Sequence, residues 1–542
     1  MSLRPRRALL GLIAGAATLA ALPATALAAG ETLTVTPAST QAGAGTSVSA
    51  TLNFDPSDTP KTVVTSLAPG MLGNLNPNPS CLAAVQLTSS CQLGTAALTT
   101  NVPATISGPL YLVPPQGSDA AGLEFAGAGL PTQYIGVTLN PTAPGALNLT
   151  TTFPQVSGAN ITSFMANFTM LAGQPFTRLP SSCGVATSSF TTTYYGTTAP
   201  GSASSSFTPT GCSSLPYAPT LKATLTKDAK DTGVAVALAV TQAANESASK
   251  SIVLSLPKGL TPNVSGVEAC LNATGCKIGT ASATSPLIPS AALANGTVTL
   301  SASGLTPVLS ISFPAPFGVT LSGVVSLTSG TVTFDSVPDV PLTALNLSIT
   351  GPNGKKAFNT NCASGNVSGA FTAQSGATVT ASAPIAYTGC ASTVTGSTGG
   401  LATGHPRLKL KLTHPKGGAN VSSVAIGLPG GLRFSRSAFV SHKTCTTLQG
   451  KKKKCTTTTL IKGLGISGAK AKGVSIKGGK LLVTLVKPSA GVTFTISGPL
   501  LAETKGLHTK AKKHRVGKLT FTLKVTDATN VVTTATAKLA AH

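Results

Sequence analysis

The chain has 542 residues, with 38 Lys and Arg against 13 Asp and Glu, a formal net charge of +25, no Trp and only 6 Tyr. Its 57 Gly, 38 Pro and 4 Met indicate short strands and turns rather than long helices. It contains no P-loop, H-E-x-x-H, G-x-S-x-G or EF-hand motif. All 6 His lie beyond residue 404, so residues 1–404 cannot form a Ser-His-Asp triad or a Cys-His dyad by themselves. We therefore expect a non-enzymatic protein with no catalytic residue, metal site or cofactor.

The first element is a predicted secretory signal peptide over residues 1–28. Arg4, Arg6 and Arg7 precede an apolar stretch, and Ala26-Leu27-Ala28 offers a small-x-small cleavage site. The apolar stretch is interrupted by Gly and Pro and is short for a membrane span, so export is favoured over an anchor. Both the Sec and the twin-arginine routes stay open. We expect a secreted or surface-associated protein with no transmembrane segment after cleavage.

A Leu-Pro-x-Gly-like turn occurs three times, at 67–71, 256–260 and 428–432, and each turn is followed by two cysteines. Such a long-period repeat predicts tandem modules. All ten cysteines fall into sequence-local couples, and an even count in an exported chain favours disulfides, although spacing alone leaves the connectivity open. The couples are Cys81 with Cys91, Cys183 with Cys212, Cys270 with Cys276, Cys362 with Cys390, and Cys445 with Cys455.

Period-two runs such as 235–240, 251–256 and 518–525 predict antiparallel sheets, so the expected fold is all-β, with tandem Ig-like β-sandwich modules in three units and few helices. The segments 91–96 and 276–281 share a Cys-x-(Leu/Ile)-Gly-Thr-Ala pattern, which indicates a duplication. The predicted units are 29–214 and 217–391, each holding one or two subdomains, and 405–542. A Ser-, Thr- and Gly-rich segment over 392–404 is predicted to be a flexible linker.

The excess of positive charge is concentrated in the third unit. Residues 405–542 hold 25 of the 38 basic residues and only Glu503 and Asp527 of the acidic ones, a net of +23 against +2 for residues 1–404. This pattern predicts attachment to a polyanion, such as an anionic wall polymer, an acidic lipid surface or nucleic acid. Nucleic acid is disfavoured because the unit has no Trp or Tyr for base stacking and uses Lys more than Arg. The candidate polyanion-binding residues are Lys451, Lys452, Lys453, Lys454, Lys510, Lys512, Lys513 and Arg515, together with Lys505.

The few carboxylates of the first two units lie in turn-like stretches, where Asp side chains commonly accept hydrogen bonds from the backbone. Asp55 and Asp58 could also hold Ca²⁺ in a loop. The turn, the cysteine couple, the Gly-Thr-Ala strand and the later Thr-Gly-Cys resemble uncharacterised secreted Ig-like β-repeat proteins of actinobacteria. That resemblance implies an extracellular β-repeat protein without assigned chemistry. The third unit departs from it because it lacks the Thr-Gly-Cys couple.

Together these features predict a non-enzymatic structural or adhesive repeat protein of the cell surface, whose basic C-terminal module attaches to an anionic surface polymer. The alternative is an extracellular ligand-binding module carried by units one and two, with the basic unit serving only solubility. Neither the ligand nor the oligomeric state follows from the sequence.

Overall fold

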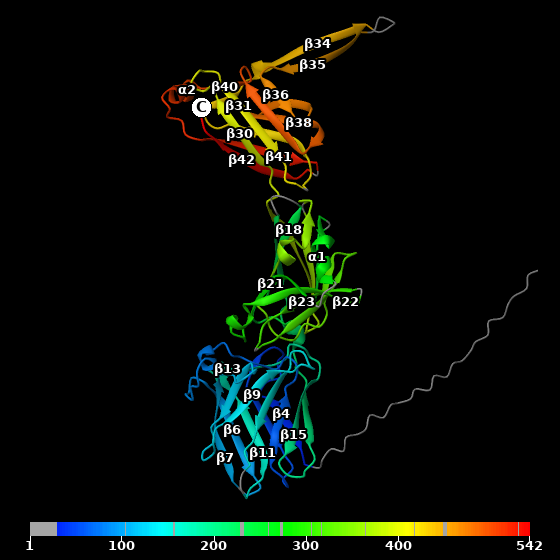
Figure 1. Ribbon diagram of the computed structural model, residues 1–542. Helices are drawn as coiled ribbons and strands as arrows, with labels where there is room; N and C mark the ends of the chain where they lie inside the picture. Colours follow the sequence, from blue (N-terminus) through cyan, green and yellow to red (C-terminus); the bar gives the residue numbers. More distant parts are fainter. Residues whose placement is uncertain are drawn as a thin grey trace, which may run out of the picture.

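The computed structural model describes residues 30–541 except 103, 156–157, 228–231, 258, 272–274, 305, 316, 364, 417, 448–452 and 529, and it gives only the backbone for 442–444, 446–447 and 453–459. The predicted signal peptide over 1–28 lies outside the described residues. Three β-domains follow one another in a row (Figure 1). The all-β prediction is confirmed, because the described residues form 42 strands and only two α-helices, α1 (Val264–Leu271) and α2 (Lys505–Lys512).

The first domain is an eleven-stranded antiparallel sheet that curls until its edge strands meet. In spatial order its strands are β1 (Thr32–Pro37), β3 (Val48–Asn53), β11 (Ile161–Phe168), β6 (Gln92–Thr100), β7 (Thr105–Val113), β8 (Ala121–Phe125), β9 (Gln133–Leu139), β10 (Leu147–Thr152), β4 (Pro60–Ser66), β15 (Ala186–Tyr194) and β16 (Gly201–Phe207). The edges β1 and β16 are in contact, and the Val35 amide donates a hydrogen bond to Ser205 Oγ at 3.0 Å. Smaller pairings join β2 (Gly45–Thr46), β14 (Thr177–Arg178) and β5 (Leu72–Gly73), and β12 (Met170–Leu171) with β13 (Gln174–Pro175).

Alternation in the sequence explains how these strands build one core. Along β15 every second side chain is buried, and the buried series includes Phe190, Thr192 and Tyr194, whereas the Thr residues between them face outward. Phe190 packs edge-to-face on Phe54, with ring centroids 5.8 Å apart, and Phe54 packs in the same way on Phe153. A single hydrophobic cluster extends from Leu33 to Tyr194, so this unit has one core rather than two subdomain cores.

The second domain is a thirteen-stranded sheet that also closes on itself, because β17 pairs with both β29 and β18. Its strands are, in order, β17 (Thr220–Lys227), β29 (Thr378–Thr388), β28 (Asn366–Ala373), β19 (Ser249–Ser255), β25 (Thr331–Phe334), β24 (Thr320–Ser326), β23 (Thr306–Ser312), β22 (Gly296–Ser303), β21 (Cys276–Thr284), β26 (Ala344–Ile349), β18 (Gly233–Thr241), β27 (Phe358–Thr360) and β20 (Leu260–Pro262). Only β17 and β29 run parallel among these pairs of described strands. Here too one hydrophobic cluster fills the interior.

The third domain is a sandwich of two sheets. One sheet contains β30 (Thr393–Gly399), β31 (Arg407–Thr413), β39 (Gly491–Ser497) and β36 (Leu464–Ser467). The other contains β37 (Ala471–Lys477), β38 (Lys480–Ser489), β32 (Val421–Gly427), β41 (Leu519–Asp527) and β42 (Val532–Leu539). A short pair of β33 (Leu432–Phe434) and β40 (Leu501–Glu503) adds to it, and the hairpin of β34 (Phe439–Thr447) and β35 (Lys453–Ile461) projects away from the sandwich (Figure 1).

The predicted flexible linker over 392–404 is wrong. Strand β30 pairs with β31 over its whole length, from Thr393 opposite Thr413 to Gly399 opposite Arg407. Its Thr and Val residues suit an edge strand, and Leu401, which follows it, is only 1% exposed. A composition rich in Ser, Thr and Gly therefore encodes the first strand of the third domain, and not a spacer.

The structure contains four described disulfides, Cys81–Cys91, Cys183–Cys212, Cys270–Cys276 and Cys362–Cys390, with Cα–Cα distances of 5.7, 5.9, 4.8 and 5.7 Å. Cys445 is also disulfide-bonded, and Cys455 lies opposite it in the β34–β35 ladder. Most of these bonds close short loops, so they restrict local segments of domains whose long-range order comes from the sheets.

The duplicated Gly-Thr-Ala pattern has a specific geometric role. Gly94 in β6 and Gly279 in β21 both sit at a register shift of their ladder. At each glycine, a backbone carbonyl of the neighbouring strand, that of Asn167 or Ser348, occupies the place that a Cβ would take. Only glycine fits at these two positions, which explains why it recurs in both domains.

Gly94→Ala should lower the free energy of unfolding by about 2 kcal/mol, because the added methyl meets backbone rather than a movable side chain. Urea unfolding followed by circular dichroism measures the loss. Gly184→Ala is the matched control, since a Cβ there meets nothing within 4 Å. Equal stability of the two variants would contradict the assignment.

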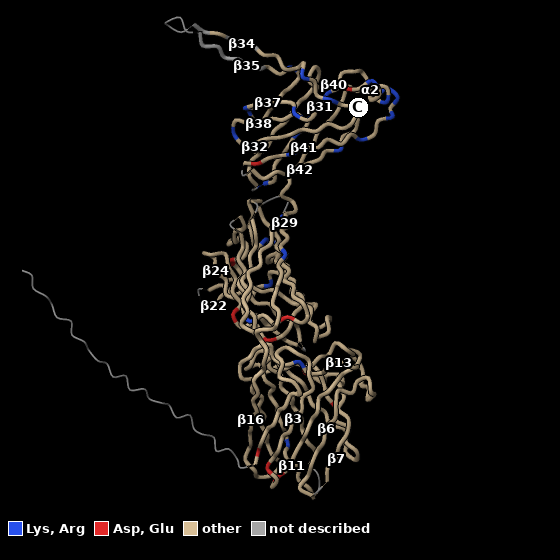
Figure 2. The backbone as a smooth tube through the Cα atoms, turned by 180° about the vertical axis from the view of Figure 1, so that it is seen from behind, with Lys and Arg blue, Asp and Glu red and all other residues tan. Residues whose placement is uncertain are grey.

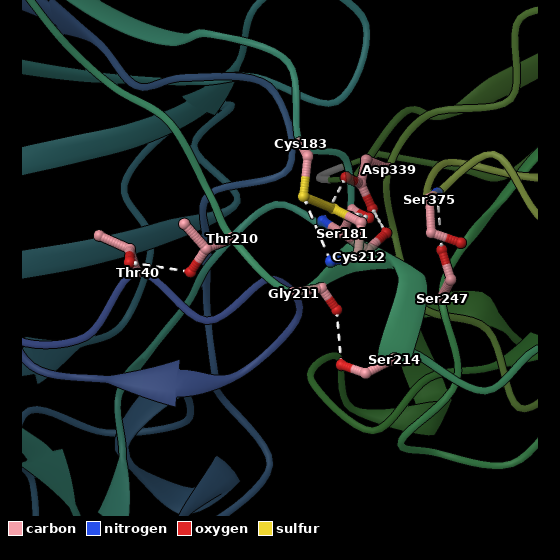
Figure 3. Close-up of a disulfide and its surroundings, with 10 residues drawn as sticks. All are labelled: Thr40, Ser181, Cys183, Thr210, Gly211, Cys212, Ser214, Ser247, Asp339 and Ser375. Atoms are coloured by element: carbon pink, nitrogen blue, oxygen red, sulfur yellow. Dashed lines mark hydrogen bonds between the residues drawn. A yellow bond between two sulfur atoms is a disulfide. The ribbon is translucent and has the colours of Figure 1, made fainter.

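The first and second domains are joined by a buried polar contact (Figure 3). Asp339 of the second domain accepts hydrogen bonds from the Ser181 amide at 2.7 Å and from Ser181 Oγ at 2.5 Å, next to the Cys183–Cys212 disulfide. Arg178 lies nearby and donates to the Glu246 carbonyl of the second domain at 3.2 Å. Burial raises the pKa of the Asp339 carboxyl, against the opposing effect of the Ser181 hydrogen bonds and the Arg178 charge. The two domains are therefore held in one fixed arrangement.

Asp339→Ala should cost about 3 kcal/mol, because it leaves the buried Ser181 donors without their acceptor. We expect the first two domains to unfold in separate calorimetric transitions in this variant. Asp335→Ala, which removes an exposed carboxylate four residues earlier, should stay within about 0.5 kcal/mol of the parent. Coupled unfolding in both variants would show that the contact does not join the domains.

Candidate functional site

Basic residues gather in the third domain, whereas the first two domains contain few charged residues (Figure 2). The side chains of this domain divide into an apolar interior and a basic exterior. Its core cluster contains only hydrophobic residues, and the Lys and Arg whose side chains are described are exposed. The charge is therefore a property of the surface of one domain.

A row of three cations lies along the middle of one sheet. In β31, Arg407, Lys409 and Lys411 are exposed, and the leucines between them are at most 1% exposed. Because alternate residues of a strand point to the same face, the three basic groups project from the outer face about 7 Å apart. We call Arg407, Lys409 and Lys411 the cation row.

The strands on either side of the cation row present small polar groups. Lys409 lies between Ser397 of β30 and Thr495 of β39, and Lys411 lies between Thr395 and Thr493. None of these neighbours is acidic, so the strands next to the row supply no carboxylate to neutralise it. Their hydroxyls can donate further hydrogen bonds to an anionic ligand.

The second predicted cluster forms around helix α2. Thr504 caps the helix through its Oγ, which accepts a hydrogen bond from the Leu507 amide at 3.3 Å, and Leu507 and Ala511 bury one face against the domain. The other faces expose the basic residues Lys505, Lys510 and Lys512, followed by Lys513 and Arg515. The structure thus brings these predicted residues together on one exposed helical turn and its end.

The end of α2 is fixed by a Schellman turn. His514 has a positive φ of 52°, its amide bonds to the Ala511 carbonyl, and the Arg515 amide bonds to the Lys510 carbonyl at 2.9 Å. Lys510 and Lys512 also lie in the last turn, where the helix dipole favours positive charge. The backbone conformation of the basic residues at this end is therefore fixed by hydrogen bonds.

Helix α2 adjoins the cation row. His508 Nδ1 lies 2.9 Å from the carbonyl of Leu401, in the turn between β30 and β31, and 3.0 Å from Glu503 Oε1. This contact places α2 beside the turn from which β31 starts at Arg407. It also engages Glu503, one of the two acidic residues of the unit, with His508 rather than with the lysines.

A groove opens at the edge of the same sandwich, between the edge strands β36 and β37 and the base of the β34–β35 hairpin. Its volume is about 1070 Å³, and its basic lining residues are Arg436, Lys470 and Lys472. The apolar floor includes Ile466 and Ile476. The groove provides a basic surface in addition to the cation row.

The predicted four-lysine cluster is described only in part. Lys451 and Lys452 lie outside the described residues, and Lys453 and Lys454 are placed by backbone alone, opposite Thr447 and Thr446 of the hairpin. Its role as a binding element stays a prediction.

The sequence analysis missed the cation row and the groove. The signal for the row was present in Arg-Leu-Lys-Leu-Lys-Leu over 407–412, where strict alternation places every cation on one face. The groove has no such signal, because its basic residues come from segments separated by more than thirty positions in the chain.

Three of the described carboxylates of the first domain have structural partners. Asp55 accepts the Ser57 amide at 2.8 Å, Asp58 accepts the Gly196 amide at 2.9 Å, and Asp119 accepts the Tyr134 hydroxyl at 2.8 Å. Within the part of the chain that the structure describes, no three His, Cys, Asp or Glu side chains gather in a way that could hold a metal ion. The described helices include none long and apolar enough to span a membrane.

Six histidines were predicted to lie on the surface, namely His405, His414, His442, His508, His514 and His542. The side chains of His442 and His542 lie outside the described residues, and His414 is half-buried. Burial lowers its pKa, the Lys227 charge lowers it further, and Asp527 raises it in part. Hydrogen bonding with the Pro415 backbone and with the Asn420 side chain opposes this lowering in part. The folded domain therefore favours the neutral ring.

No protein-family model matches the chain, and no curated protein matches it. Among solved structures, it is similar to the collagen-binding domain of the Erysipelothrix rhusiopathiae surface protein RspB, at 10% identity and a TM-score of 0.16, over 59% of this chain and 91% of that one. It is also similar to the Enterococcus faecalis MSCRAMM ACE, at 13% identity and a TM-score of 0.15, over 59% and 93% of the two chains. A putative membrane-anchored protein from Corynebacterium diphtheriae matches at 11% identity and a TM-score of 0.15, over 94% and 89%. These TM-scores are low, so the description of the fold rests on the sheets themselves.

Acidification should destabilise the third domain through His414. The unfolded chain has the ordinary pKa of 6.5, above the folded value, so it takes up the proton first. The stability supplied by neutral His414 is present above that pH and is lost as the pH falls below it. Calorimetry between about pH 7 and pH 5 should show a smaller loss of Tm in His414→Asn than in the parent. Exposed His405→Asn is the control, and an unchanged pH dependence in His414→Asn would contradict the assignment.

Proposed function

We propose that this protein is a non-enzymatic extracellular surface protein whose third domain attaches to an anionic polymer. The cation row carries the proposal. Three basic side chains stand at regular intervals on a rigid strand, flanked by hydroxyls and without an acidic neighbour on the adjoining strands. A polymer with a charge on each repeating unit can contact all three at once, whereas a small anion contacts one.

The chemistry of the basic groups favours phosphate or carboxylate polymers. Lysine dominates, and it acts as a point charge that attracts either anion without reading its shape. The neighbouring Ser and Thr hydroxyls can donate to the anionic oxygens between successive cations. Nucleic acid is a weaker candidate, because the domain offers neither Trp nor Tyr for stacking on bases.

The first two domains fit the role of a spacer or presenting unit. Residues 1–404 have a net charge of only +2, three of whose positive charges belong to the predicted signal peptide, so they add little attraction to a polyanion. The buried contact between Ser181 and Asp339 holds the two domains in line. A surface bound at the third domain would therefore be separated from the far end by a stiff pair of domains.

A triple variant Arg407→Ser, Lys409→Thr and Lys411→Thr should lower the affinity of the full chain for polyphosphate or polygalacturonate by about tenfold at low salt and weaken its salt dependence. The replacements match the hydroxyl residues already on the neighbouring strands, so the sheet should be preserved. Binding is measured by retention on immobilised polymer across a series of NaCl concentrations, with neutral dextran as the blank.

The matched control removes the same charge from the opposite sheet. Lys480, Lys524 and Lys538 are exposed on β38, β41 and β42, and their replacement by Thr should reduce the affinity by no more than about threefold. Equal losses in both triple variants would mean that only net charge matters and that the cation row is no site. Salt-independent retention of the parent would reject polyanion attachment altogether.

A further inference from the structure

A partly enclosed apolar cavity lies where the first domain meets the second. It measures about 280 Å³, and its walls come from β1, β3, β8, β9 and β10 at one end of the curled sheet. Residues of the second domain cover it, namely Ile288, 317–320, Pro338 and Val340. Phe317 of this cover packs against the hydrophobic core of the first domain. Both domains thus contribute walls to the cavity.

The lining selects for hydrocarbon. Among its described residues there is no Asp, Glu, Lys, Arg or His, and the polar members are Thr65, Asn140, Thr177 and Thr320. The side-chain oxygen Oδ1 of Asn140 already accepts hydrogen bonds from the Thr142 amide at 2.9 Å and from the Thr142 hydroxyl at 2.8 Å. A charged or strongly polar group inside the cavity would lose its hydration without gaining partners. An alkyl chain carries no polar group and therefore avoids this desolvation cost.

The volume indicates the size of the occupant. An apolar cavity of about 150 Å³ in another protein stays dry and holds benzene. This cavity is nearly twice as large, which corresponds to roughly a dozen carbon atoms. A medium-length alkyl chain fits this volume.

The cavity cannot disappear by a small approach of the two domains, because hydrogen bonds fix its cover. Asp339, bound to Ser181, lies between the lining residues Pro338 and Val340. The carbonyl of Leu287, next to Ile288, accepts the Leu75 amide at 2.8 Å. Lining atoms that face an empty space lose dispersion contacts, and an apolar ligand restores them.

The rim gives the polar end of a ligand access to water. Pro141 and Pro144 of the first domain and Gly318 and Thr320 of the second line the cavity and are exposed. We infer that the junction binds the hydrocarbon chain of a single-chain amphiphile, with the chain inside and the polar group at this rim. This inference goes beyond the proposed attachment function and uses other residues, so either can fail without the other.

The test uses the full chain with decanoate as the probe and acetate as the control for the carboxylate alone. We expect one decanoate per chain by native mass spectrometry, with a rise in the Tm of the first two domains, and no effect of acetate. Decyl maltoside, which attaches the same chain to a sugar, distinguishes a free fatty acid from a chain carried on a larger head group.

Two variants fill the cavity from opposite walls. Leu147→Trp from the first domain and Ile288→Phe from the second should each weaken decanoate binding by about tenfold or more. Leu82→Trp is the matched control, because Leu82 packs on the same core but does not line the cavity, and it should bind as the parent does. The parent contains no Trp, so the introduced indole also reports the folding of each Trp variant by fluorescence.

Absence of a Tm shift with decanoate in the parent would overturn the inference, as would an equal shift with acetate. Undiminished decanoate binding by a folded filling variant would also overturn it. If Leu147→Trp does not fold, Ile288→Phe alone carries the comparison with Leu82→Trp.

Discussion

The carboxylate of Asp339, buried against Ser181, fixes the position of the second domain on the first. Burying an ionisable group is unfavourable unless its hydrogen bonds are satisfied, and here both oxygens accept bonds from the other domain. The contact lies beside the Cys183–Cys212 disulfide, which restricts the segment that supplies Ser181 (Figure 3). Together with the bonds from Arg178 to the Glu246 carbonyl and from the Leu75 amide to the Leu287 carbonyl, this contact holds the first two domains beside the cavity that they share.

Charged and apolar chemistry are separated along the molecule. The first two domains use their curled sheets to enclose large apolar interiors, and few of their residues are charged (Figure 2). The third domain combines an equally apolar core with a cationic surface, because β31 alternates leucine with Arg and Lys. A charged surface on a strand is compatible with a dry core only when this alternation is strict.

Local patterns in the sequence predicted much of the fold for a physical reason. Side-chain direction in a strand is set by the backbone alone, so alternation such as that of 518–525 identifies an antiparallel strand without knowledge of its partner. The charge of the third unit is equally local. The same local reasoning failed at 392–404, since a polar composition does not reveal that a neighbouring edge, here β31, will pair with the segment.

The sequence by itself determined the β class, the spacing of the cysteines, the excess of positive charge in the last unit and the alternation that gives β31 its two faces. Only the tertiary structure decided which strands neighbour one another, how α2 lies beside Arg407, and where the two closed sheets enclose an apolar space. Those features arise from contacts such as Ser181 with Asp339, which are 158 positions apart. No periodicity or composition records a pairing over that distance, because it depends on the packing of every strand between them.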